Sequence, residues 1–475
     1  MNHLESTRVM AKAISHGAPT LEPSPMRLSK SRLVAWLQCP KRLWLQQHHP
    51  EFAAPSEAAA NRMAQGHKVG AAAQTLFPGG HLVGHVDNLS AALRETEALL
   101  AKPGDVTVFE AALKASDILV RADVLVRENG ACRLIEVKSS TKVKDYQVTD
   151  AGIQTWVARA AGLDRRRHRA RPRQQPVRLS RRTGLPRSPR PRRRLGGGRP
   201  HPGPSPAWIA DAKRDLAGPV PAVDVGPQCT DPFECEFRGH CAPVDAEYPV
   251  TILPHGGKFA RQLHDEGYTD LRDVPEERLT KSDHLRVWRA SRSGEAELSP
   301  DAAGKLAALP WPRYFLDFET VGPAVPLWPG TRPYQKIPMQ WSCHRQEADG
   351  NLVQLPPFLA TGDGDPRRPF AAALVAAIGG DGPILVYNAV FERGVILELA
   401  AAFPDLASRL QALADRLFDL LPFTREHYYH PAMMGSWSIK AVLPTIAPDL
   451  DYANLDDVQS GEMVEPVYFE MIDPA

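Results

Sequence analysis

Three residues in the first half of the chain have the types and spacing of a metal-dependent phosphodiesterase site. Asp123 lies in the apolar run DILVRADVLV, and Glu136 and Lys138 lie in the next run, ACRLIEVKSS. Two carboxylates that project together bind Mg²⁺ or Mn²⁺ through oxygen and leave coordination positions for water and a phosphate oxygen. The metal lowers the pKa of its bound water, and a nearby lysine can orient that water or stabilise the transition state.

A β-hairpin is the element that must position these side chains. The two runs flank Asn129-Gly130, the strongest short hairpin signal. Because side chains alternate along a strand, Glu136 and Lys138 are expected on one face, with Val137 toward the core and Asp123 beside them on the first strand. An isolated E-x-K would indicate a surface ion pair. The aspartate on the paired strand and a helix expected from about residue 145 favour a functional site instead.

The pattern ADVL…LIEVKSS, followed by a helix with Gln154, resembles the RecB-family PD-(D/E)XK nucleases, including the four-cysteine CRISPR-associated exonucleases. The resemblance covers about residues 27–245. It implies that Asp123, Glu136 and Lys138 are catalytic, that the two carboxylates bind the metal, and that Gln154 supports the site.

Four cysteines fit the same resemblance. Cys229, Cys235 and Cys241 lie in CTDPFECEFRGHC, and Cys39 lies in an early helical segment broken at a proline. Four thiolates suit either an iron-sulfur cluster or zinc. In similar nucleases one cysteine before the core and three after it bind a 4Fe-4S cluster. The wide C-x5-C-x5-C spacing and the remote fourth ligand favour the cluster, with zinc as the alternative.

The second half carries another set of carboxylates. The segment YFLDFET predicts a strand with Asp317 and Glu319 on one face, and ILVYNAVFERGVILELA predicts a strand, a turn and a helix that carries Glu392. These motifs resemble the DEDD exonucleases of the RNase H-like fold. The resemblance implies that Asp317, Glu319 and Glu392 bind metal and, more loosely, that Asp419 in LFDLLPF is a further acidic site residue. Carboxylates that converge on two cations are what in-line phosphodiester hydrolysis requires.

The charge distribution is uneven. The formal net charge is +2, yet residues 165–199 contain fifteen Arg and no Asp, Glu or Lys, so subtracting them leaves −13 on the remainder. This segment has no helical or strand period and is expected to be disordered. One interpretation is a basic arm that adds salt-sensitive affinity for nucleic acid. The other, which we favour, is a stretch of high-GC gene read out of frame, and resequencing codons 164 to 205 would decide between them.

The sequence therefore predicts an α/β, multi-domain protein. A RecB-like PD-(D/E)XK domain with a cysteine-bound cluster spans 27–245, with 164–205 as a disordered or frame-shifted insert. A helical connector spans 246–310, and an RNase H-like, DEDD exonuclease-like domain spans 311–475.

The function hypothesis is metal-dependent hydrolysis of DNA in repair or in defence against foreign DNA. The alternative is a nucleic-acid-binding or scaffold protein whose nuclease sites have decayed. No long apolar stretch and no secretory signal is found, so no membrane partner and a cytoplasmic location are expected. Cys132 and Cys343, each alone in a strand-like stretch, are expected to be buried thiols without a ligand role.

The last residues raise a question about the second site. DEDD enzymes use a fourth acidic residue on a late helix, and only fourteen residues follow Gly461, none of them in the expected motif. Asp473 is two residues from the end, where fraying disfavours a fixed ligand. The expectation is that the second domain is truncated and that 311–475 alone has little exonuclease activity.

Overall fold

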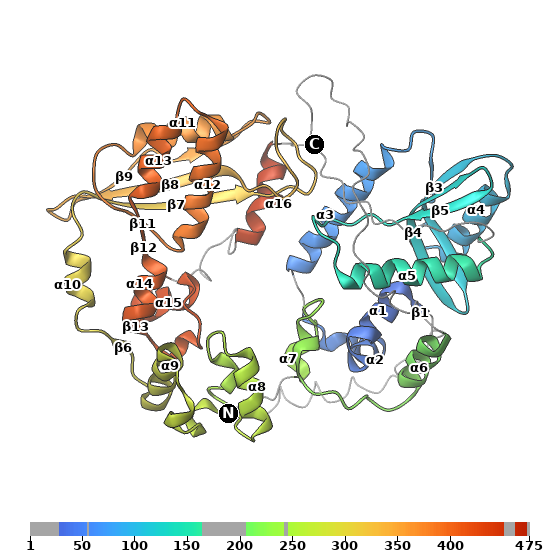
Figure 1. Ribbon diagram of the computed structural model, residues 1–475, viewed down its shortest axis with the longest axis horizontal. Coiled ribbons are helices and arrows are strands. Elements are labelled where there is room, and N and C mark those ends of the chain that lie inside the picture. The colour runs from blue at the N-terminus through green and yellow to red at the C-terminus, as the bar shows by residue number, and fades with distance from the viewer. Residues whose placement is uncertain (1–27, 55–56, 164–205, 242–245, 451–460, 473–475) are drawn as a thin grey trace, which may run out of the picture.

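The computed structural model describes residues 28–54, 57–163, 206–241, 246–450 and 461–472. It is a mixed α/β protein with one mixed sheet in each half (Figure 1). The Arg-rich segment 164–205, its predicted disorder and its two interpretations lie outside the described residues, as does Asp473. Within the described residues, no helix combines the length and the apolar character needed to cross a membrane.

The first half forms a five-stranded sheet in the order β1-β4-β3-β2, with β5 paired to β4. Its strands are β1 (Leu28–Ser29), β2 (His81–Leu82), β3 (Val106–Ala115), β4 (Ile118–Glu128) and β5 (Ala131–Ile135). Its helices are α1 (Lys30–Gln38), α2 (Pro40–His48), α3 (Glu57–Gln74), α4 (Leu89–Ala101), α5 (Asp145–Ala160), α6 (Pro206–Ala217) and α7 (Arg238–Cys241). Helices α1, α4, α5 and α6 contribute to one apolar core with β3 and β4.

The predicted hairpin is present. Strands β4 and β5 pair antiparallel from Val124↔Ile135 to Glu128↔Ala131, and Asn129 and Gly130 both adopt positive φ, as a type I′ turn requires. The ladder ends at Ile135, so Glu136 and Lys138 follow the strand instead of lying within it. The physical reason is local, because the N–H of Val137 donates to Oδ2 of Asp123 at 2.6 Å and not to a partner strand.

The second half contains a six-stranded sheet in the order β10-β8-β7-β11-β12, with β9 paired to β8. Its strands are β7 (Arg313–Val321), β8 (Ile337–Gln346), β9 (Leu352–Gln354), β10 (Phe358–Leu359), β11 (Ile384–Val386) and β12 (Leu417–Asp419). Strand β7 is antiparallel to β8 and parallel to β11, and β11 is parallel to β12. Helices α11 (Arg367–Ala377), α12 (Ala389–Ala402) and α13 (Ala407–Asp415) pack on β7, β8 and β11 in a second core.

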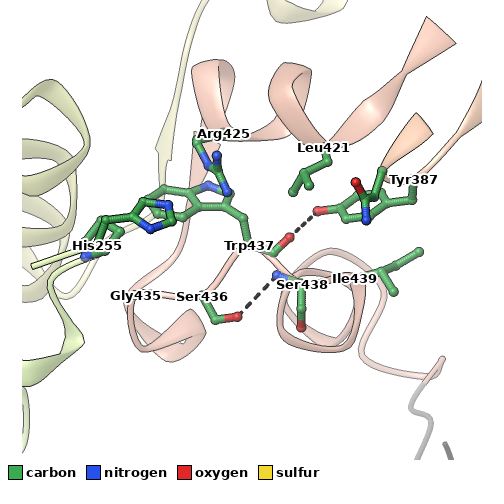
Figure 2. Close-up of a pocket in the computed structure, with 11 residues that line it drawn as sticks. His255, Tyr387, Leu421, Arg425, Gly435, Ser436, Trp437, Ser438 and Ile439 are labelled. Carbon is green, nitrogen blue, oxygen red and sulfur yellow. Dashed lines mark hydrogen bonds between the residues drawn. The ribbon is translucent and has the colours of Figure 1, made fainter. Parts of the chain in front are cut away.

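Residues 246–310, the expected connector, contain short helices and share a core with the end of the second half. The connector contains α8 (Gly257–Asp265), α9 (Ser282–Ser293), β6 (Glu297–Leu298) and α10 (Ala302–Ala307). Strand β6 pairs with β13 (Tyr428–Tyr429), and Trp288 of the connector is buried in one cluster with Trp437. That cluster is flanked by α14 (Leu420–His427) and α15 (Ile439–Ile446). His255 of the connector and Trp437 line the same pocket (Figure 2).

Helix α16 (Gly461–Ile472) connects the two halves (Figure 1). Val464 and Tyr468 are buried against residues of β7 and β8. The carboxylate of Glu465 accepts hydrogen bonds from the Gly322 N–H at 2.8 Å and from the Gln65 side chain of α3 at 3.0 Å. The second sheet is thereby joined to a helix of the first half.

Candidate functional site: two carboxylate sites and a cysteine pocket

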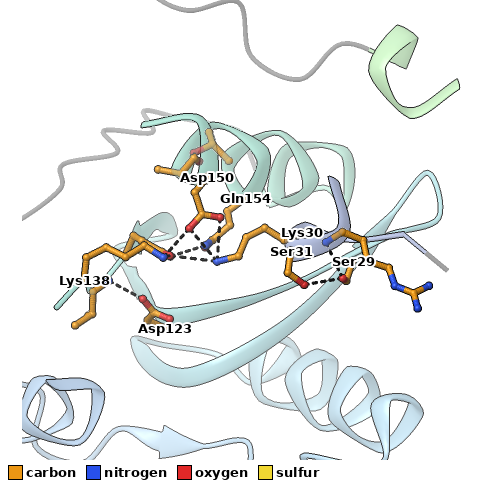
Figure 3. Close-up of polar contacts among 12 residues, drawn as sticks. Ser29, Lys30, Ser31, Asp123, Lys138, Asp150 and Gln154 are labelled. Carbon is orange, nitrogen blue, oxygen red and sulfur yellow. Dashed lines mark hydrogen bonds and ion pairs between the residues drawn. The ribbon is translucent and has the colours of Figure 1, made fainter. Parts of the chain in front are cut away.

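The first site gathers side chains from β4, from the segment that follows β5, and from α5 (Figure 3). Asp123 extends from β4, Glu136 and Lys138 follow β5, and Gln154 lies on α5. The predicted four residues therefore lie together, and the Gln154 amide donates a hydrogen bond to Oε2 of Glu136. Val137 packs against the small apolar cluster around Phe109, which turns its neighbours to the opposite side as the alternation predicts.

Two further residues complete the network and were missed by sequence reasoning. Nζ of Lys138 lies 2.6 Å from Oε1 of Glu136 and 2.6 Å from Oδ2 of Asp150 on α5. Nζ of Lys30, the first residue of α1, lies 3.2 Å from the same Glu136 oxygen and 3.2 Å from Oδ1 of Asp150. The two ammonium groups thus bridge the two carboxylates.

A sequence signal existed for Asp150 but not for Lys30. Asp150 precedes Gln154 by four residues, so both lie on one face of α5 and both are buried. Lys30 is 106 residues from Glu136, and nothing local predicts their contact. The Ser29 hydroxyl caps α1 by accepting from the Arg32 N–H, and this fixes the helix start that places Lys30.

The two carboxylates predicted to bind metal, Asp123 and Glu136, have pKa values shifted in opposite directions. Burial and the neighbouring charge of Glu136 raise the pKa of Asp123 to about 7. Burial also acts on Glu136, but Lys30 and Lys138 outweigh it and lower the pKa of Glu136 to about 2. Near neutral pH, Glu136 is therefore ionised and Asp123 is close to its midpoint.

The pKa values of Lys138 and Asp150 follow from the same contacts. Burial would lower the pKa of Lys138, yet Glu136 and Asp150 raise it above its ordinary value. Burial raises the pKa of Asp150 despite the two ammonium groups beside it. Lys138 therefore stays protonated and acts as a hydrogen-bond donor at neutral pH.

The donor set at this site is suited to a hard divalent cation. As the chain stands, the described residues include no group of three or more His, Cys, Asp or Glu arranged to hold a metal ion. Asp123 and Glu136 nevertheless offer oxygen ligands, and their mutual repulsion is part of what raises the pKa of Asp123. A divalent cation would relieve that repulsion, so Mg²⁺ or Mn²⁺ fits the residues present.

The four cysteines of the predicted cluster line one pocket. Cys39 stands between α1 and α2, while Cys229, Cys235 and Cys241 come from the segment that follows α6. Burial raises the pKa values of Cys235 and Cys241, and the charge of Cys229 adds to the effect on both. Four thiols that line one pocket offer the sulfur donors that a soft metal centre prefers.

The cysteine segment is held against α1 and α2 by polar contacts. The amide of Gln38 donates to the carbonyl oxygens of Gln228 and Phe233, each at 2.7 Å. Arg42 and Gln46 contact the Glu236 carboxylate at 2.8 and 2.6 Å. The two chain segments are therefore aligned by contacts other than the thiols. Cys132 and Cys343 lie apart from this pocket, on β5 and β8, and Cys343 is fully buried.

The second site lies on β7 and the elements beside it. Asp317 and Glu319 alternate with Leu316 and Phe318, which face the core. Desolvation raises the pKa of Asp317, and desolvation together with Asp317 raises the pKa of Glu319. The two carboxylates thus share one face of the strand, as the sequence predicts.

Glu392 on α12 joins them and is the most buried of the three. Its side chain is 3% exposed, and Oε2 has no hydrogen-bond partner among the described residues. Burial raises the pKa of Glu392 to about 7, and the charges of Asp317 and Asp419 add to the effect. A buried carboxylate oxygen without a partner is costly, and a cation beside it would offset that cost.

The side chain of Asp419 caps two helices at this site. Its Oδ1 accepts hydrogen bonds from the N–H groups of Asn388 and Leu421, each at 2.9 Å, and its Oδ2 accepts from Ala389 at 3.0 Å. It thereby caps the first turns of α12 and α14 together. These hydrogen bonds explain the position of the Asp419 carboxylate without a bound metal. They also fix the start of α12, the helix that carries Glu392.

The folds and sites define an α/β protein with two separate carboxylate sites and a pocket of four cysteines. Residues 314–438, which run from β7 to the turn before α15, match a family model described as "Domain of unknown function (DUF2779)". No curated protein and no solved structure matches the chain.

Proposed function

We propose that this chain is a Mg²⁺- or Mn²⁺-dependent nuclease that hydrolyses DNA phosphodiester bonds, with a PD-(D/E)XK site in its first half. The observation that carries the proposal is the convergence of Asp123, Glu136, Lys138 and Gln154 at the end of one hairpin. The carboxylates would hold the cation, which supplies an activated water and offsets charge on the phosphate.

The chain's own residues have distinct roles in this proposal. Gln154 fixes the Glu136 carboxylate, and Asp150 fixes the Lys138 ammonium group. Lys138 remains protonated and would donate hydrogen bonds to the attacking water or to the phosphate. Lys30 lies beside the same carboxylates and adds positive charge where a phosphate would approach.

The second sheet supports a further, DEDD-like exonuclease site in an RNase H-like domain. An antiparallel unit of β7, β8 and β9 continues into parallel strands β11 and β12, and carboxylates from β7 and α12 approach one another. Asp317, Glu319 and Glu392 would hold cations there. The strongest support for this second site is Oε2 of Glu392, which is buried and has no hydrogen-bond partner in the part of the chain that the structure describes.

We also propose that the cysteine pocket holds a 4Fe-4S cluster, with zinc as the alternative. Cys39, Cys229, Cys235 and Cys241 would be its ligands. The cluster would tie α1 and α2 to the segment after α6, across the first half of the chain. Repair of DNA or defence against foreign DNA, in the cytoplasm, is the proposed setting.

The decisive experiment is degradation of end-labelled DNA by the full chain with and without Mg²⁺ or Mn²⁺. The first site is isolated in an Asp317→Asn background and compared with added Asp123→Ala or Lys138→Ala. We expect each to lower the rate at least 100-fold. Asp117→Asn is the matched control and should be neutral, because Asp117 is exposed, pairs with Lys213 at 2.9 Å and has a φ of 63°, which asparagine tolerates.

The assignment of the first site would be wrong if the chain shows no metal-dependent cleavage, or if Asp123→Ala and Lys138→Ala both leave cleavage unchanged. DNA binding without cleavage would support the alternative, a nucleic-acid-binding protein with decayed sites. Single-stranded, duplex and RNA substrates with either end blocked identify the substrate and the polarity.

A further inference from the structure

A pocket of about 510 Å³ opens at the β11–α12 junction, at the start of the helix that carries Glu392 (Figure 2). Its size is within the range of small-molecule sites, about 300–1,000 Å³. Three parts of the fold line it: the connector turn at His255, the β11–α12 junction at Tyr387-Asn388, and α14 with the loop Gly435–Ile439. The connector thus contributes directly to this cavity.

From this arrangement we propose that the pocket binds an unpaired nucleobase at the end of the nucleic-acid strand cut at the second site. The inference rests on the proposed function and adds a substrate class to it, single-stranded ends. Three observations carry it: the position of the pocket, the chemistry of its walls and their rigidity.

The position follows from the β11–α12 junction. Asn388 lines the pocket, and its backbone N–H donates to Asp419 at 2.9 Å. Glu392 lies four residues further along the same helix, a rise of about 6 Å. A base in the pocket would therefore place the adjoining phosphodiester at the carboxylates.

The walls combine aromatic rings with the guanidinium cation of Arg425. His255 and Tyr387 contribute rings, and the guanidinium carbon of Arg425 lies 5.7 Å from the centre of the ring of Trp437, which also lines the pocket and is 3% exposed. Within the described residues, the Arg425 guanidinium forms no hydrogen bond or ion pair. Aromatic rings and guanidinium planes stack on unpaired bases, and a guanidinium also binds phosphate.

The walls are held in place before any ligand binds. The Trp437 indole donates to the Tyr428 carbonyl at 2.8 Å, and the Tyr387 hydroxyl donates to the Trp437 carbonyl at 2.6 Å. Gly435 has a φ of 76°, and a Cβ there would lie 1.7 Å from the carbonyl oxygen of Ile252. The connector and the loop are therefore in backbone contact, and the pocket keeps its shape. Binding of a base would then cost little conformational entropy, because the walls are already ordered.

An unpaired base can enter such a pocket, whereas a base in a duplex must first be unstacked and unpaired at a cost. The proposal therefore predicts that single-stranded ends bind more tightly than blunt duplex ends. It also predicts that a nucleotide binds more tightly than its sugar phosphate alone.

The test uses the full chain in EDTA, so that binding is measured without cleavage. Calorimetric titration with dAMP, and with 2-deoxyribose 5-phosphate as the probe without a base, should give saturable binding for dAMP and much weaker binding for the sugar phosphate. Arg425→Gln and His255→Asn should each weaken dAMP binding on the order of tenfold. Asparagine is chosen at 255 because the residue has a φ of 52°, which asparagine tolerates.

Arg292→Gln is the matched control, because Arg292 stacks on buried Trp288 of the same core at 4.8 Å but does not line the pocket. It should bind dAMP as the wild type does. Circular dichroism and thermal melting show whether each variant is folded. The single-strand preference is measured in parallel, with a labelled oligonucleotide as a single strand and as a blunt duplex.

The outcomes separate this inference from the proposed function. In the first outcome, the wild type cleaves DNA, but Arg425→Gln and His255→Asn leave dAMP binding and the preference for single-stranded ends unchanged. This result would overturn the proposed base-binding role of the pocket and leave the proposed nuclease function standing. Binding of dAMP that is lost in both variants, in a chain that cleaves nothing, would support the pocket and overturn the nuclease. A wild type that shows no saturable dAMP binding overturns the inference.

Discussion

The ammonium group of Lys138 lies 2.6 Å from Oδ2 of Asp150, a carboxylate of α5 that has no place in the D…E-x-K pattern. The same ammonium group lies 2.6 Å from Glu136, so Asp150 fixes the orientation of a lysine that would face the reaction. Asp150 touches the site through Lys138 and Lys30 and is a positioning residue.

We expect Asp150→Asn to lower cleavage at the first site about 10- to 100-fold, the range found for residues that orient a site's ligands. Because Asp150 raises the pKa of Lys138, its neutralisation should also move the alkaline limb of the pH profile to lower pH. The rate is measured against pH with the second site inactivated by Asp317→Asn. Asp145→Asn, exposed on the same helix, is the control, and a pH profile identical to wild type would argue against positioning.

The raised pKa of Glu392 predicts a pH-dependent stability in the absence of metal. A carboxyl whose pKa is about 7 when folded and 4.5 in its ordinary state binds its proton more tightly in the folded chain. Its contribution is therefore fully present below about pH 4.5, is lost as the pH rises to about 7, and is constant above that. Glu392→Gln should remove this loss, on the order of 1–3 kcal/mol.

The measurement is urea unfolding in EDTA at several values between pH 5 and pH 8, for wild type and Glu392→Gln. Glu277→Gln, which changes an exposed glutamate of the connector, is the control and should follow the wild-type curve. Parallel curves for wild type and Glu392→Gln across this range would contradict the buried, proton-binding state of Glu392.

The cysteine pocket predicts a coloured protein. Anaerobically purified chain should be brown and contain iron and sulfide, and Cys229→Ala or Cys241→Ala should lose the colour and much of the stability, because metal binding contributes to folding. Cys132→Ala, outside the pocket, should keep both. Colourless protein with stoichiometric zinc would show that the alternative metal is correct.

The contact between the connector and the pocket loop predicts a strong effect at one glycine. Gly435→Ala would place a methyl group 1.7 Å from the Ile252 oxygen at a positive φ, so it should cost roughly 3 kcal/mol or more of unfolding free energy. Gly394→Ala, in α12 with no atom within 4 Å of an added Cβ, should be neutral or stabilising by about 0.5–1 kcal/mol. Equal urea midpoints for the two variants would mean that the connector does not pack there.

The sequence by itself determined the local parts of this protein. Asn129-Gly130 between alternating apolar runs specified the hairpin, because few residues adopt two successive positive φ angles and the alternation sets the face of each side chain. The same reasoning placed Asp317 and Glu319 together on β7 and began α12 after Asn388. The extension of β5 to Lys138 was a local error of this reasoning. Strand pairing stops at Ile135, and the N–H of Val137 donates to the Asp123 carboxylate instead of to a neighbouring strand.

Tertiary structure decided everything that joins distant segments. Lys30 reaches Glu136 across 106 residues, and the connector shares its core with Trp437. Neither contact can be read from the sequence, because apolar burial is non-directional: a periodic pattern marks which residues are buried but not which distant segments pack together. The capping role of Asp419 could not be predicted from its motif either. Three backbone N–H groups donate to its carboxylate only because α12 and α14 start at the ends of neighbouring strands. Residue types along the chain indicate which chemistry is available, and packing between distant segments fixes which of those residues meet.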